Sequence, residues 1–103
     1  MNEAIKFSER FLIAGERAKA TCELADAGEG AIPILQSIFD GSAKNKFGVS
    51  YNKLGMPLSC ALIASGQLGV MATPLLTYIN EQASLAHPYA IEALDIIASS
   101  ENT

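Results

Sequence analysis

The side chains that could carry acid–base, nucleophilic or metal chemistry are few, and their spacing assembles no recognisable site. His87 is the only histidine, and it precedes Pro88 where a helix start is expected. Glu92 and Asp95 stand three residues apart, on one face of a helix, but no histidine or second carboxylate pair completes a metal site. There is also no glycine-rich phosphate loop. The sequence therefore predicts no catalytic residue, no metal and no cofactor, and we expect a protein that is not an enzyme.

Cys22 and Cys60 both lie in apolar, helical-looking sequence without a second Cys or His at metal-ligand spacing. We expect two buried, reduced thiols in preference to a disulfide. A Cys–His pair with His87 is conceivable in space, although nothing local supports it. The first ten residues mix charges, unlike a secretory signal, so we expect a cytoplasmic protein.

Length and charge indicate one acidic domain that spans residues 1–103. Half of the 103 residues are hydrophobic, which is enough for a single continuous core. The formal net charge of −4 disfavours nucleic acid as a partner, because the phosphate backbone requires a cationic surface. The same charge favours a basic partner.

The 27 residues from Leu54 to Asn80 contain no charged side chain, so they must be shielded from water by the chain or by a bilayer. Their length would span a membrane. Glycines and prolines divide them, however, and we expect two buried helices at 56–65 and 70–81 with a break from Gly66 to Gly69, and no membrane partner. A helix that is apolar all round is surrounded by other elements. This stretch is therefore expected to be the part least able to touch a partner.

Hydrophobic spacing and capping residues predict about six helices. Phe11 and Leu12 belong to the apolar side of the first, and residues 16–26 form either its bent continuation or a separate second helix. Pro33 fits the first turn of the next helix. The last helix begins at Pro88, and its predicted core stripe is Ala90, Ile91, Leu94, Ile97 and Ala98.

An internal echo accompanies these helices. Pro33-Ile-Leu-Gln-Ser-Ile-Phe-Asp aligns without gaps with Pro74-Leu-Leu-Thr-Tyr-Ile-Asn-Glu, and Ile63-Ala-Ser with Ile97-Ala-Ser. Over residues 30–99 this pattern resembles HEAT and armadillo repeats, although the usual Asp and Arg between helices are missing. The resemblance implies an all-α fold of three antiparallel hairpins stacked as an α-solenoid. An irregular bundle is the alternative.

Residues 41–53 combine basic and aromatic side chains and contain no acid. Phe47, Val49 and Tyr51 stand between Lys44 and Lys46 on one side and Lys53 on the other. Such content can mark a nucleic-acid contact, but the acidic whole favours a loop whose aromatics enter the core while the lysines stay solvated. Three residues of this loop are retained as a second candidate contact for a protein partner: Lys44, Lys46 and Phe47.

The best candidate binding region is the acidic C-terminal part, where no Lys or Arg follows Leu54. Four residues of the last helix lie off its predicted core stripe, and an aromatic and an aliphatic beside carboxylates suit protein docking. A solvated outer face is the plainer interpretation. The candidates are Tyr89, Glu92, Asp95 and Ile96, together with Glu81 of the preceding helix.

A small acidic helical domain without catalytic motifs resembles, in type and not by signature residues, the bacterial immunity proteins, including those of contact-dependent growth inhibition. The resemblance implies a non-enzymatic inhibitor that binds a basic nuclease toxin, with carboxylates blocking the active site. The rival from another class is a structural or adaptor helical-repeat module that holds subunits of a larger assembly together.

Overall fold

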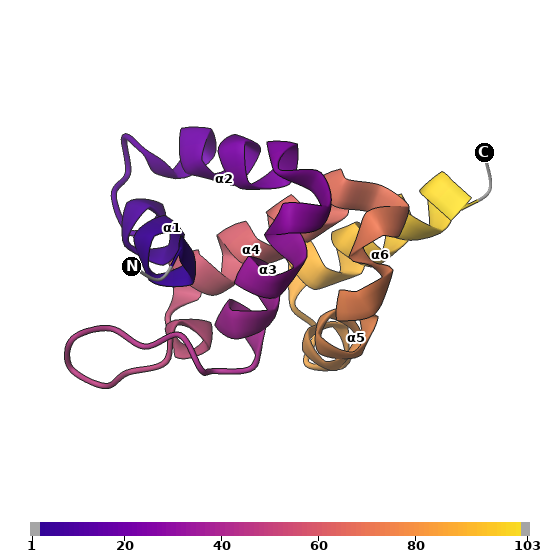
Figure 1. Ribbon diagram of the computed structural model, residues 1–103. Helices are drawn as coiled ribbons and strands as arrows, with labels where there is room; N and C mark the ends of the chain where they lie inside the picture. The colour runs from indigo at the N-terminus through magenta and orange to yellow at the C-terminus, as the bar shows by residue number, and fades with distance from the viewer. Residues whose placement is uncertain (1–2, 102–103) are drawn as a thin grey trace.

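Helix α4 (Gly55–Leu68) runs through the middle of the fold, and the other helices are arranged around it (Figure 1). The computed structural model describes residues 3–101. Helices α1, α2, α3 and α6 all contact α4, while α5 packs on α6. Because α4 carries no charged residue, it can lie among these neighbours without burying an unpaired charge.

The remaining elements follow one another with short connections, apart from one longer loop at residues 40–50. No β-strand forms within residues 3–101, so the predicted all-α class is confirmed. In chain order they are α1 (Glu3–Phe11), α2 (Arg17–Asp26), the 3₁₀ turn η1 (Gly28–Gly30), α3 (Ala31–Phe39), the 3₁₀ turn η2 (Tyr51–Lys53), α4, the 3₁₀ helix η3 (Gly69–Leu75), α5 (Leu76–Ser84) and α6 (Pro88–Glu101).

The contacts between helices describe a globule and do not show a solenoid. In a solenoid each hairpin would contact only the hairpins next to it. Here α4 contacts helices on both sides of it in the chain, from α1 to α6. The echoed prolines also differ in setting, since Pro33 lies in the first turn of α3 and Pro74 lies inside η3.

Residues 3–26 form two helices, which settles the alternative that the sequence left open. The guanidinium Nε of Arg17 donates a hydrogen bond to the carbonyl of Phe11 at 3.1 Å, which satisfies an acceptor at the end of α1. Arg10 of α1 pairs with Glu23 of α2 and lies 3.5 Å from Glu16, so charge joins the two helices. Phe11 is buried as predicted, but Leu12 lies beyond the helix and is exposed.

The predicted break at Gly66 is wrong, because α4 continues through Gly66 to Leu68. The reason is packing against α6. A Cβ placed on Gly66 would lie 3.3 Å from the Cα of Ala93, so the missing side chain lets the two backbones approach. The helix ends instead at Gly69, whose φ of +61° is a left-handed conformation that glycine adopts readily.

The same contact corrects the predicted orientation of α6. Ala90, Ala93 and Ile97 are buried, whereas Ile91 and Ala98 of the predicted stripe are exposed. A helix that approaches Gly66 closely must turn a small side chain toward it, and Ala93 is that side chain. The buried face of α6 is therefore rotated from the predicted stripe toward Ala93.

By length and composition alone, the segment Gly55–Ser84 could cross a membrane. Core helices of soluble proteins meet the same two criteria. Within its most apolar window, 56% of the residues are buried inside the fold. The prediction that this stretch is wholly enclosed is nevertheless wrong. Its exposed side chains include Met56 and Gln67 of α4 and Val70 and Met71 of η3.

Candidate functional site

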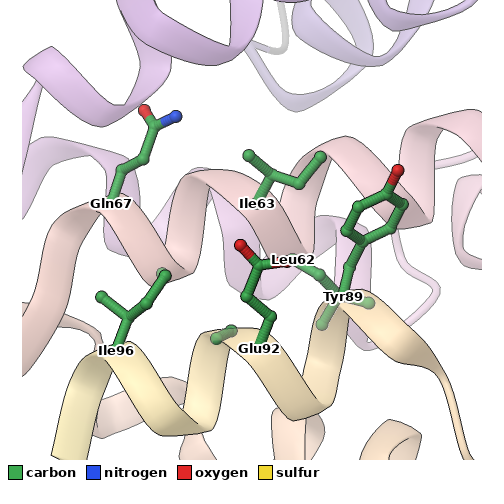
Figure 2. Close-up of a pocket in the computed structure, with 8 residues that line it drawn as sticks. Leu62, Ile63, Gln67, Tyr89, Glu92 and Ile96 are labelled. Atoms are coloured by element: carbon green, nitrogen blue, oxygen red, sulfur yellow. The ribbon is translucent and has the colours of Figure 1, made fainter. Parts of the chain in front are cut away.

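A groove lies between α4 and α6, and three of the predicted contact residues line it. Tyr89, Glu92 and Ile96 of α6 meet Ile63 and Gln67 of α4 there (Figure 2). Leu62, Gly66 and Ala93 also line this groove, whose volume is about 160 Å³. Apart from the Glu92 carboxylate, the Gln67 amide and the Tyr89 hydroxyl, its side chains are apolar. Its chemistry therefore suits a mainly apolar group with a cationic neighbour.

The depth of the groove follows from the contact beneath it. Gly66 and Ala93 bring the two helix backbones together, and neither has a side chain long enough to fill the space above. The larger side chains on either side, Ile63, Tyr89 and Ile96, therefore stand as walls. Figure 2 shows Glu92 extending from α6 toward α4 between the positions of Tyr89 and Ile96.

Two neighbouring hollows extend this groove into one continuous face. The first lies between α2 and α4 and shares Ile63, Gln67 and Tyr89 with the groove. The second shares Ile96 and lies beside η3, where Asp95 and Val70 line it. Met56, Val70, Tyr89 and Ile96 are each at least about a third exposed along this face. Exposed apolar groups grouped in this way are typical of contact surfaces.

Negative charge dominates the α6 side of the face. Neither Glu92 nor Asp95 forms an ion pair with any residue in the range 3–101, and no Lys or Arg follows Leu54 in the sequence. Arg17 lines the far hollow, but its guanidinium donates to the carbonyls of Phe11 and Leu12. The two carboxylates are therefore free to attract a basic group.

The other predicted contact residues lie elsewhere. Glu81 is exposed on α5 and lines none of these hollows. Lys44, Lys46 and Phe47 belong to the loop after α3, which projects beside α1, while α6 runs toward the opposite end (Figure 1). The acidic helix and the basic loop therefore form two separate surfaces.

The aromatics of that loop behave differently from one another. Tyr51 enters the core as predicted, and its hydroxyl donates to Glu9 of α1. Phe47 was expected in the core but is 78% exposed at the loop tip. The side chain of Asn45 accepts the backbone N–H groups of Phe47 and Val49 and closes the turn. Phe47 therefore stays at the surface, where it lines a shallow hollow with Ile5 and Leu12 at α1.

Sequence reasoning missed the α4 half of the groove. Met56, Ile63 and Gln67 share one side of α4, because their spacings of seven and four residues repeat with the helical turn. The one signal that could have revealed this side is Gln67 itself. In a helix that otherwise looks apolar all round, a single polar side chain such as Gln67 indicates which side faces solvent.

His87 immediately precedes α6 and does not line the groove. Its backbone carbonyl accepts the N–H groups of Ala90 and Ile91, each at 3.1 Å. The hollow that holds Cys22 and Cys60 is not lined by His87, so the structure does not bring a Cys–His pair together there. Among residues 3–101, no three His, Cys, Asp or Glu side chains converge on a position where a metal could bind.

The two thiols are expected to differ in reactivity, since Cys22 is exposed and Cys60 is buried. This corrects the prediction of two buried thiols. Burial raises the pKa of the Cys60 thiol, while a hydrogen bond to Thr21 and the charge of Arg17 oppose the shift.

We expect an aromatic disulfide reagent at pH 8 to label about one thiol in the native fold and about two in denaturant. Cys22→Ser is the control, and rapid native labelling of that variant would contradict the burial of Cys60.

Comparison with known proteins yields no match among family models, curated proteins or solved structures.

Proposed function

We propose that this chain is a non-enzymatic protein-binding domain, and that the groove between α4 and α6 receives a basic partner. One observation carries the proposal: Tyr89, Glu92 and Ile96 share one groove with Ile63 and Gln67 of α4. A partner that inserts an apolar side chain would bury Ile63 and Ile96, while its cations approach Glu92 and Asp95. Anchors of this kind, surrounded by charge, are typical of protein interfaces.

The charges and the apolar groups would act at different stages of binding. The uncompensated carboxylates of α6 would speed encounter with a cationic partner, and salt would weaken that effect. The apolar walls would set the lifetime of the complex, because they lose contact with water only after docking. The chain itself needs no cofactor for such a role.

Within this class, we propose an immunity protein that neutralises a basic nuclease toxin in the cytoplasm. A nuclease binds phosphate through cations, so Glu92 and Asp95 would occupy positions that phosphate groups take in the substrate. The gene should then lie directly beside a toxin gene, and its deletion alone should be lethal or unobtainable. A viable deletion without an adjacent toxin would remove this proposal.

Reversing the charges of Glu92 in the groove and Asp95 in the adjoining hollow is expected to weaken partner binding by about tenfold or more, because two attractions become repulsions. The variant is Glu92→Lys with Asp95→Lys, and the measurement is the Kd for the adjacent toxin by titration calorimetry. Asp26→Lys with Glu29→Lys is the matched control. Asp26 and Glu29 are exposed, have the same spacing, change the net charge equally and line none of the hollows described above. Equal loss in both variants would move the site away from α6.

An adaptor role is the second candidate, and the separation of the two surfaces favours it. The loop after α3 projects on the α1 side of the fold, whereas α6, which forms one wall of the groove, runs toward the other end (Figure 1). An adaptor between two subunits would require such separate surfaces. The alternative of a stacked helical-repeat module rests only on the internal echo. A partner that protects the Phe47 loop and the groove at once from hydrogen exchange would support the adaptor over the inhibitor.

A further inference from the structure

The loop between α3 and η2 presents one aromatic side chain to solvent on an ordered turn. The Oδ1 atom of Asn45 accepts the N–H groups of Phe47 at 2.9 Å and Val49 at 3.0 Å. The backbone N–H of Asn45 also donates to the carbonyl of Val49 at 2.9 Å. The backbones of Lys44 and Ser50 pair in an isolated antiparallel β-bridge. Phe47 is 78% exposed at the tip of this turn. Because the turn is already ordered, docking Phe47 would cost little conformational entropy.

The groove between α4 and α6 has the size and lining that a phenyl ring requires. Its volume is about 160 Å³, and Leu62, Ile63, Ala93 and Ile96 supply apolar walls. In another protein, an engineered cavity of about 150 Å³ lined by aliphatic and aromatic side chains binds benzene. The ring of Phe47 is therefore of the right size for the groove, and Tyr89 would add an aromatic contact.

The charges around the two features are complementary. Lys44 and Lys46 precede Phe47 in the loop, and the Nζ atom of Lys46 lies 5.3 Å from the centre of its ring. Glu92 lines the groove and Asp95 lines the adjoining hollow. A loop that inserts Phe47 would bring its cations to the carboxylates, an attraction that also sets the direction of docking.

The loop cannot reach the groove of its own chain. Its two ends are joined to each other, because Ser50 Oγ donates to the carbonyl of Gly41 at 2.9 Å. Its base is tied to α3, because Asn52 Nδ2 donates to the carbonyl of Phe39 at 2.8 Å. Figure 1 shows the tip on the α1 side of a molecule whose longest dimension is 41 Å, with α6 running toward the other end. The occupant that matches in size, charge and reach is the loop of a second copy.

We propose that copies of this chain associate head to tail, with the Phe47 loop of one copy seated in the α4–α6 groove of the next. The two surfaces of such a contact differ, so each copy keeps a free loop and a free groove and the association continues past a dimer. One loop buries little area, which makes the contact weak. A basic partner of the groove would compete with it, although the self-association does not depend on the proposed function.

The test measures the mass of the intact protein by sedimentation equilibrium between about 10 µM and about 1 mM, the range suited to a small interface. We expect the mean mass to rise with concentration beyond that of a dimer. Phe47→Ser, which removes the ring, and Ile96→Glu, which charges the groove, should each stay monomeric. Ile96 and Ile91 are 40% and 45% exposed on α6, and only Ile96 lines the groove, so Ile91→Glu is the control that should associate like the native chain.

Mixing the two monomeric variants distinguishes this contact from any symmetric one. The Phe47→Ser copy keeps an intact groove and the Ile96→Glu copy keeps an intact loop. Their equimolar mixture should therefore form a dimer and nothing larger, because only one loop–groove pair can form. A native chain that stays monomeric throughout, a Phe47→Ser chain that associates like the native one, or a mixture that stays monomeric would each overturn the proposal.

A charge exchange within one chain tests whether Lys46 faces Glu92. Lys46→Glu and Glu92→Lys should each weaken association about tenfold. The double variant places opposite charges on loop and groove again, so its association constant should return to within about threefold of the native value. A double variant no better than the weaker single one would show that this pair does not meet in the contact.

Discussion

Replacement of Gly66 with leucine is expected to lower the free energy of unfolding by about 3 kcal/mol, which makes it one of the most damaging single changes in this chain. Even a Cβ at this position would lie 3.3 Å from the backbone Cα of Ala93 and 3.4 Å from Cδ1 of Ile96. Backbone cannot rotate away as a side-chain tip can, so a longer side chain must separate α4 from α6. The groove between them would widen at the same time.

Chemical denaturation followed by far-UV circular dichroism measures this effect. Gly55→Ala is the matched control, because Gly55 also lies in α4 but has nothing within 4 Å of an added Cβ. That control should be neutral or up to about 1 kcal/mol more stable, since alanine reduces the freedom of the unfolded chain. If Gly66→Leu unfolded at the same denaturant concentration as Gly55→Ala, the close approach of α4 and α6 would be refuted.

Replacement of Tyr51 with alanine is expected to cost about 3–5 kcal/mol, as for other large aromatic truncations in a core. Tyr51 is fully buried, and its hydroxyl donates to Glu9, so it attaches the base of the 40–50 loop to α1. Tyr51→Phe keeps the ring and loses only this hydrogen bond, so it should cost about 1–2 kcal/mol. Denaturation of the three proteins separates ring packing from hydrogen bonding. Equal costs for the two variants would contradict this division.

The raised pKa of Tyr51 also predicts how the free energy of unfolding changes at alkaline pH. Burial raises the pKa of the Tyr51 hydroxyl, and its hydrogen bond to Glu9 and the charge of Glu9 act in the same direction. The unfolded chain then releases this proton first, near its ordinary pKa of about 10. Above that pH the unfolded state binds fewer protons than the folded state, so the contribution is complete at lower pH and is lost as pH rises. Tyr51→Phe should show a shallower alkaline loss in pH-dependent unfolding, and an identical loss would contradict it.

Several features of the fold were predictable because they depend on local backbone chemistry. Pro33 and Pro88 lie in the first turns of α3 and α6, where a missing N–H costs no hydrogen bond. The candidate groove was half predictable for a similar reason. Tyr89, Glu92 and Ile96 recur at helical spacing, which places them on one side of any helix that contains them.

The other half of the groove depends on contacts between residues distant in sequence. Ile63 and Gln67 become groove residues only because α6 packs against Gly66, and no pattern within α4 specifies that neighbour. The outward position of Phe47 likewise depends on how Asn45 closes its turn. Sequence periodicity describes one helix at a time, whereas the orientation of one helix on another is set by which side chains are small enough to touch.

The sequence by itself therefore determined the all-α class, the approximate helices, the uneven charge and the surface of α6 that carries the candidate site. The tertiary structure decided that α4 is the central helix of a globule, that Gly66 is a packing position and not a break, and that the acidic helix and the basic loop are separate surfaces. The physical reason is range. Charge, capping and periodicity act within a few residues, while close packing depends on pairs such as Gly66 and Ala93 that only folding brings together.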